Sequence, residues 1–253
     1  MNGFLPFLKK EITQTLRTYK LLILVLVLVS FAVMSPALAR FTPEILQLSG
    51  IEGMIALPAP VALDSWIQFY STTSQMGILA LMLIYGGILS GEKSKGTLVL
   101  PLTHGLSRSA ALLAKYLVSV GGWTVSLALA ALVNHLYTLY LFPGEEVAFV
   151  LGGLASFWLC GVFLLSLVPL SSVLVKGSFG GLALPGGVLF TLLVLMIFPD
   201  LFSFNPLLLA SSPLQVMAGV DEWTILLPAL ITSAVTSAVA VAAAMVLFRR
   251  SSL

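Results

Sequence analysis

Charged residues are sorted between alternate segments of this chain, and the sorting predicts its topology. Long apolar runs divide the 253 residues, which include 12 lysines and arginines and 10 aspartates and glutamates. One alternate set of segments holds nearly all the bases: Lys9, Lys10, Arg17, Lys20, Lys93, Lys95, Arg108, Lys115, Lys176, Arg249 and Arg250. The other set holds one base and most of the acids: Arg40, Glu44, Glu52, Asp64, Glu145, Glu146, Asp200, Asp221 and Glu222. Because bases stay on the cytoplasmic side of a membrane, we expect an even number of spans with both chain ends inside.

The composition places the chain in a lipid bilayer. It is 59% hydrophobic and only 9% charged, whereas soluble domains average about 25% charged residues. We therefore predict an all-α integral membrane protein that forms one membrane domain over residues 1–253. Apolar runs of spanning length predict six transmembrane helices, at about 21–38, 65–89, 112–141, 147–170, 179–198 and 223–248.

Two flanking segments are predicted to lie at the membrane surface. In residues 3–20 apolar side chains share one helical face and bases lie among them, which is typical of an interfacial helix on the inner leaflet. A frayed tail is the alternative. On the outer side, Asn205-Pro206 has the form of a helix start, with Asn as cap and Pro in the first turn. The apolar segment 206–219 is too short to span, so we expect it to dip into the membrane or pack on the outer mouth.

The chain lacks the common patterns of catalysis and nucleotide binding. No Gly-x-Ser-x-Gly elbow and no Gly-x-x-x-x-Gly-Lys-[Ser/Thr] phosphate loop occurs in the sequence. The histidines are His104 and His135, and the single cysteine is Cys160, so no clustered metal ligands are expected. No Asp, Glu, Lys or Arg falls at the centre of a predicted span, which counts against an ion-coupled carrier.

A polar stripe marks the outer half of the second predicted span. Gln68, Ser71, Thr72 and Gln75 follow the spacing i, i+3, i+4, i+7, which places them on one face of an α-helix. They form either the wall of a substrate path or a set of hydrogen bonds between helices. Elsewhere, Gly87-x-x-x-Gly91 and Gly177-x-x-x-Gly181 predict close approaches between helices.

The loop at about 90–111 is the longest on the predicted inner side. Leu98, Leu100 and Leu102 are apolar residues flanked by charges, and exposed apolar groups of this kind favour a docking surface. A loop that packs beneath its own spans is the alternative. Ser107 is suited to cap the helix that follows.

At this loop the chain resembles the permease subunits of ATP-binding-cassette transporters of the type-2 exporter class. The residues that carry the resemblance are Glu92, Gly96-Thr97-Leu98, Ser107-Arg108 and Lys115. Lys10-Glu11, the stretches 35–46 and 62–66, and Asn205-Pro206 extend it over nearly the whole chain. These further matches point to a bacterial or archaeal branch, and so to a prokaryotic plasma membrane.

The resemblance implies a role for each part. Residues 3–20 would be an elbow helix, 94–104 a coupling helix in a groove of a separate ATPase subunit, and 200–221 an outer re-entrant hairpin. The implied ATPase contacts are Glu92, Gly96, Thr97, Leu98, Leu100, Leu102, Ser107 and Arg108, with a second, smaller contact at Lys176. A second permease chain, identical or related, would complete the membrane part. ATP and Mg²⁺ would bind to the partner, so this chain would carry no cofactor, and it would bind no nucleic acid.

We thus expect a transport subunit without enzymatic activity, which exports a substrate when its partner hydrolyses ATP. Three alternatives remain at this point. A secondary carrier or channel would be expected to show a midplane ionisable residue or inverted repeat. An intramembrane enzyme would need a nucleophile and a base. An assembly or signalling subunit that moves no cargo would share the same coupling parts.

Overall fold

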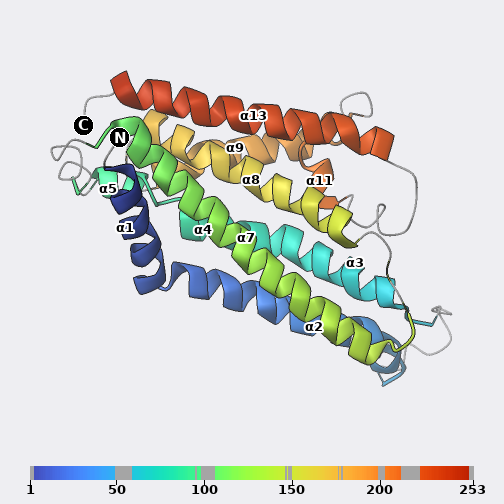
Figure 1. The fold of residues 1–253 in the computed structure, drawn as a ribbon. Helices are drawn as coiled ribbons and strands as arrows, with labels where there is room; N and C mark the ends of the chain where they lie inside the picture. Colours follow the sequence, from blue (N-terminus) through green and yellow to red (C-terminus); the bar gives the residue numbers. More distant parts are fainter. Residues whose placement is uncertain are drawn as a thin grey trace.

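A computed structural model describes residues 3–48, 59–94, 96–97, 106–145, 147, 150–175, 177, 179–198, 203–211 and 223–250. These residues form helices and no β-strand, which confirms the all-α prediction. The long helices lie side by side along one axis, and α1 lies across one end of the bundle (Figure 1). The helices are α1 (Phe4–Arg17), α2 (Lys20–Leu48), α3 (Ala62–Thr72), the π-helix η1 (Thr73–Gly77), α4 (Ile78–Tyr85), α5 (Ser90–Ser94), α7 (Arg108–Leu141), α8 (Val150–Leu174), α9 (Gly180–Leu195), α11 (Leu208–Ser211) and α13 (Trp223–Arg250).

Five stretches of described helix are long and apolar enough to cross a membrane. They are Lys20–Ile45, Ala62–Ser94, Arg108–Leu141, Val150–Leu174 and Leu226–Arg250. The remaining predicted span, 179–198, contains α9, which has 16 residues and is shorter than the roughly 20 residues that a bilayer needs. The chain is a multi-pass membrane protein, and six complete crossings stay a prediction.

The two ends of the bundle carry different charges, as the sequence predicted. The start of α7 and the end of α13 meet at one end, because Arg249 Nε donates to Ser109 Oγ at 2.7 Å. α1 and α5 lie at that same end (Figure 1). We call it the basic end, since its described bases are Lys9, Lys10, Arg17, Lys20, Lys93, Arg108, Lys115, Arg249 and Arg250. The opposite end holds Asp64 and Glu145, where the carboxylate of Glu145 accepts from the Ala62 backbone N–H at 2.5 Å.

The first predicted span was too short, because α2 does not stop near residue 38. It continues through Pro36 and Pro43 as one helix of 29 residues. The hydroxyl before each proline donates to the preceding turn: Ser35 to the Phe31 carbonyl at 2.6 Å and Thr42 to the Leu38 carbonyl at 2.5 Å. Each hydroxyl adds a bond to the turn before its proline, next to the carbonyl that the proline leaves without an N–H partner, Ala32 for Pro36 and Ala39 for Pro43.

The second predicted span, 65–89, is a composite of α3, η1 and α4. The π turn inserts at Thr73–Gly77, where glycine lets α2 approach closely. A Cβ built on Gly77 would lie 2.7 Å from Thr73 Cγ2 and 2.9 Å from Leu28 Cδ2. A π turn holds more residues than an α turn, so side chains after it are rotated relative to those before it.

The predicted outer hairpin, 200–221, is described only over 203–211. Asn205 caps this segment as predicted, because its Oδ1 accepts from the Leu207 N–H at 2.9 Å. Its Nδ2 donates to the Leu192 carbonyl of α9 at 2.8 Å. Residues 205–210 are buried, and α11 packs against α8 and α13. The segment thus packs into the bundle, and the complete hairpin stays a prediction.

The core of the bundle is aromatic and closely packed. Tyr70 and Trp123 contact Phe157 with ring centroids 5.6 and 5.7 Å apart. Trp123 Nε1 donates to the Trp158 carbonyl at 3.0 Å, and a Cβ on Gly161 would lie 2.3 Å from that nitrogen. Large rings on one helix are therefore matched by small residues on the next, which lets the helix backbones come close.

The closest backbone approach that we find joins the turn after α4 to the start of α9. A Cβ built on Gly181 would lie 1.8 Å from the Gly86 carbonyl oxygen and 2.8 Å from Ser172 Oγ. The sequence predicted a close approach at Gly181 without naming its partner, which is Gly86. We call this contact the Gly86–Gly181 pivot.

We predict that Gly181→Ala separates α4 from α9 and lowers the thermal stability of the purified chain. The clash is with backbone, so the expected cost is that of an overpacked core, about 1–3 kcal/mol or more. Gly187→Ala in the same helix is the matched control, because a Cβ there meets nothing within 4 Å and alanine favours helix. Equal melting temperatures for the two variants would contradict the assigned contact.

Candidate functional site

The structure describes both ends of the predicted docking loop. Glu92, Gly96 and Thr97 lie on one side, and Ser107 and Arg108 on the other. The remaining predicted contacts fall outside the described residues: Leu98, Leu100, Leu102 and Lys176. The site is therefore built from the two anchors of the loop and from the groups that hold them.

The first anchor explains the spacing of Glu92, Gly96 and Thr97. Gly96 has φ +69°, a left-handed conformation that glycine adopts at little cost and that often ends a helix. The chain then turns back, so that the Thr97 N–H donates to the Glu92 carbonyl at 3.2 Å and the Thr97 hydroxyl donates to it at 3.4 Å. The backbone at the start of the loop is thus tied to Glu92.

The second anchor joins the loop to α7 and α13. Ser107 Oγ accepts from the Ala110 N–H at 3.2 Å, which confirms the predicted cap. Arg108 Nη1 donates to the Phe248 carbonyl at 3.5 Å. Phe248 lies in the last turn of α13, where a cation is stabilised by the negative end of the helix dipole. The end of the loop is therefore fixed to two long helices at once.

A buried charge cluster lies between these anchors. The ammonium of Lys115 on α7 is 2.8 Å from Glu11 Oε2 of α1 and 2.8 Å from Glu92 Oε2 of α5. Lys10 Nζ is 2.8 Å from Glu11 Oε1 and 3.7 Å from Glu92 Oε1. Gln14 Nε2 donates to Glu92 Oε1 at 3.1 Å. We call Lys10, Glu11, Glu92 and Lys115 the charge cluster; its formal charges cancel.

Two members of the charge cluster are buried beneath α1, whereas the side chains of Lys10 and Glu92 are 46% and 16% exposed. Glu11 and Lys115 are each 1% exposed. Phe7 packs against Ala111 and Ala114 of α7, and its ring centroid lies 5.1 Å from Lys10 Nζ and 5.8 Å from Lys115 Nζ. Small α7 residues admit the ring, and the ring face attracts both ammonium groups.

Removing one member of such a cluster leaves an uncompensated charge with little water around it. For buried ion pairs this costs about 3–5 kcal/mol, whereas replacing both partners with neutral groups is often tolerated. The charge cluster therefore makes the positions of α1, α5 and α7 depend on one another. The family resemblance pointed to Lys10-Glu11, Glu92 and Lys115 as separate motifs. It did not predict that these side chains contact one another.

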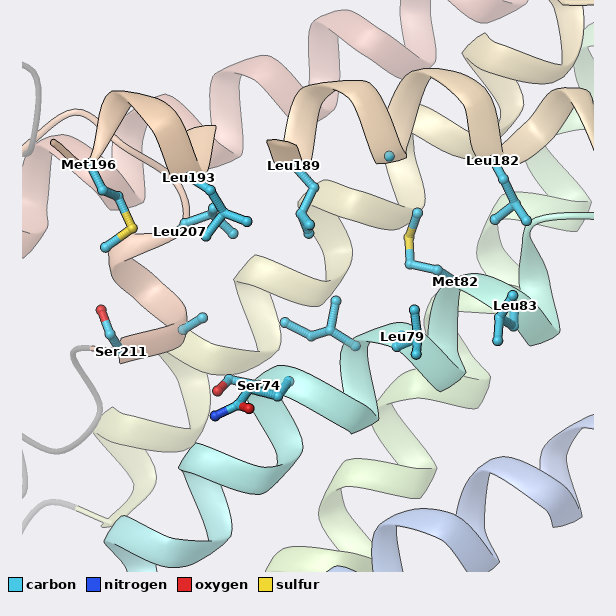
Figure 2. Close-up of a pocket in the computed structure, with 14 residues that line it drawn as sticks. Ser74, Leu79, Met82, Leu83, Leu182, Leu189, Leu193, Met196, Leu207 and Ser211 are labelled. Carbon is cyan, nitrogen blue, oxygen red and sulfur yellow. The ribbon is translucent and has the colours of Figure 1, made fainter. Parts of the chain in front are cut away.

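An apolar cleft of about 490 Å³ opens between α4 and α9, above the Gly86–Gly181 pivot. Leucines and methionines form most of its wall, including Leu79, Met82, Leu189 and Met196. Ser74 and Ser211 lie at one end of the cleft, and Leu83 and Leu182 lie at the other (Figure 2). Its lining is thus polar at one end and apolar towards the pivot.

One member of the predicted polar stripe reaches this cleft. Gln75 lines it together with Ser74, which the sequence analysis did not single out. Gln68 Nε2 donates weakly to Thr72 Oγ1 at 3.4 Å within α3, and Ser71 is exposed. Gln75 lies in the π turn that follows α3, so its direction is rotated relative to Gln68, Ser71 and Thr72. A path lined by Gln68, Ser71 and Thr72 stays a prediction.

Comparisons with known proteins show the family to which the chain belongs. No protein-family model matches the chain. It is 32% identical over 231 residues to the probable ABC transporter permease protein NosY of Stutzerimonas stutzeri, which covers 83% of this chain and 76% of that protein. The chain belongs to the family of ABC transporter permease proteins. The probable permease NosY of Pseudomonas aeruginosa is 37% identical over 154 residues, which are 59% of this chain and half the length of that relative.

Family membership gives the described parts their context. The chain is a permease subunit, a multi-pass protein of the cell membrane. Among the described residues no group of three or more His, Cys, Asp or Glu side chains is placed to hold a metal ion. The described part of this permease holds the charge cluster at its basic end and the apolar cleft between α4 and α9.

We predict that Lys115→Met releases α1 from α7, because Glu11 then keeps only Lys10 as a counter-ion. Hydrogen exchange in α1 should rise by a factor that corresponds to about 3–5 kcal/mol. The double variant Glu11→Gln/Lys115→Met removes both buried charges and should recover much of the protection. Lys93→Met is the control, since Lys93 takes part in no ion pair among the described residues. A double variant as unprotected as Lys115→Met would contradict the ionic role.

Proposed function

We propose that this permease exports a substrate with energy from ATP that a separate ATPase subunit hydrolyses. The observation that carries the proposal is the charge cluster, which fastens α1, α5 and α7 beside both anchors of the loop at 98–105. A force applied to that loop would act on Glu92 through Gly96 and Thr97, and on α7 and α13 through Ser107 and Arg108. The ATPase would hold ATP and Mg²⁺, and this chain would hold no cofactor.

The proposed docking surface is the loop itself, with Leu98, Leu100 and Leu102 in a groove of the ATPase. Lys176 would supply the smaller second contact. Two permease chains would then pair with two ATPase subunits, as the family resemblance implies. Nothing in this arrangement calls for a nucleic acid.

The proposed route from the loop to the substrate passes through α5. The Gly91 N–H donates to the Gly87 carbonyl at 3.0 Å, and the Lys93 N–H donates to the Leu89 carbonyl at 3.0 Å. These bonds join α5 to the turn that contains Gly86. Movement of Glu92 would therefore reach the Gly86–Gly181 pivot, and the cleft between α4 and α9 would open or close above it. Gln75 and Ser74 would line the substrate path there.

The docking proposal is tested by co-purification with the ATPase subunit. Wild type is expected to bring the ATPase down, whereas Leu98→Asp/Leu100→Asp should lose it, because two carboxylates would be buried in an apolar groove. Leu151→Asp is the matched control: the same change at an exposed leucine of α8, 81% accessible and far from the basic end. Failure of wild type to bind an ATPase, or ATP hydrolysis by the isolated chain, would sink the proposal.

The coupling proposal is tested with a cysteine in the cleft. Because Cys160 is fully buried, a Gln75→Cys variant should dominate labelling by a water-soluble maleimide. With the ATPase bound, ATP should change its labelling rate severalfold, and adding Glu92→Gln should abolish the change in complexes that are shown by co-purification to retain the ATPase. Thr42→Cys, on the exposed outer part of α2, should label at a constant rate. An ATP-independent rate at Gln75→Cys would overturn this route.

A further inference from the structure

Helix α1 has three distinct faces, and one of them packs against α7. Phe7, Glu11 and Thr15 are buried at a spacing of four residues. This face contacts α7 through Ala111 and Ala114 and closes over the charge cluster. The other two faces are more exposed, although Lys10 and Gln14 at the edge of one of them also contact Glu92 of the charge cluster.

The second face of α1 is apolar and exposed. Leu5, Ile12 and Leu16 lie on it and are 73%, 46% and 54% exposed. Tyr19, directly after the helix, is 63% exposed and has φ 57°, so the chain turns sharply there before α2 begins. α1 lies across the basic end of the bundle (Figure 1). An apolar face in this place suits the boundary between headgroups and acyl chains.

The third face of α1 is basic and hollowed. Lys9, Thr13 and Arg17 follow each other at a spacing of four, and a hollow of about 500 Å³ lies along them. Lys10, Gln14, Thr18 and Pro6 complete its lining, so it contains three bases and no acid. The one acid of α1, Glu11, points away into the charge cluster.

Two of the three bases along this hollow are available to an outside anion, since Lys10 is paired with Glu11 and Glu92. Neither Lys9 nor Arg17 takes part in an ion pair among the described residues, and both are exposed. The hydroxyls of Thr13 and Thr18 already donate to the Lys9 and Gln14 carbonyls, so the charged groups of Lys9 and Arg17 would supply the donors to phosphate oxygens. Basic clusters beside membrane spans bind anionic lipids at about 1 kcal/mol per base.

We propose that the basic hollow of α1 binds the headgroup phosphate of an anionic phospholipid, whose acyl chains lie along Leu5, Ile12 and Leu16. The two faces adjoin on one helix, so a single amphipathic ligand covers both. A free phosphate ion would leave the apolar face uncovered, and an acidic peptide would do the same. The site holds lipid of the inner leaflet against the helix that closes the charge cluster.

The test is native mass spectrometry of the full-length chain in detergent with added lipid. Wild type is expected to retain phosphatidylglycerol in preference to phosphatidylcholine. Lys9→Gln/Arg17→Gln should weaken phosphatidylglycerol binding by about ten- to thirty-fold, as expected for the loss of two bases. The control is Arg40→Gln/Arg250→Gln, which removes the same charge from two exposed arginines elsewhere and should leave binding unchanged. Matched melting temperatures confirm that both variants are folded.

Two further experiments distinguish a lipid headgroup from a free phosphate ion as the ligand. Ile12→Gln/Leu16→Gln should weaken lipid retention while the basic hollow stays intact, because the acyl chains lose their surface. Millimolar inorganic phosphate should not displace the lipid. The proposal is overturned if wild type shows no preference for phosphatidylglycerol, or if inorganic phosphate alone displaces the bound lipid. It is also overturned if Lys9→Gln/Arg17→Gln and the control Arg40→Gln/Arg250→Gln weaken lipid binding equally.

Discussion

The buried ammonium of Lys115 constrains the whole basic end of this permease. The two carboxylates that contact it come from other helices, Glu11 from α1 and Glu92 from α5, each at 2.8 Å. A charge buried without its partners costs several kcal/mol, so α7 reaches its final surroundings only with both in place. α5 has five residues, too few to be a stable helix alone. Its position therefore depends on the charge cluster and on the turn that joins it to α4.

The body of the bundle is held by a different kind of interaction. In lipid, burying leucine against leucine gives little net drive for helices to associate, so close packing decides which helices meet. Gly161 lies beneath Trp123, and a Cβ on Gly122 would lie 1.9 Å from the Tyr85 hydroxyl oxygen. Shape thus specifies the apolar body, and charge specifies its basic end. The Gly86–Gly181 pivot lies where these two regions meet.

Sequence reasoning succeeded where a signal is local or summed over many residues. The sorting of bases predicted which segments share an end, and the Ser107 and Asn205 caps depend on neighbours within a few residues. It failed at α2, where periodicity could not show that Pro36 and Pro43 lie inside one helix. It also missed the π turn, which depends on Leu28 approaching Gly77 from another helix. Glu11 and Lys115 are 104 residues apart, and no spacing rule reports their contact.

The proposed coupling requires that the basic end is rigid and that the side chains lining the cleft can repack. Between Gly96 and the pivot, α5 and its preceding turn are joined by successive backbone hydrogen bonds, so little displacement can be absorbed there. At the pivot the contact is between backbone atoms. No side chain there can change rotamer to absorb a displacement of the helices. The cleft walls beyond it are leucine and methionine, and methionine repacks with little penalty. A small movement of Glu92 would therefore be transmitted to the cleft, where α4 and α9 are free to separate.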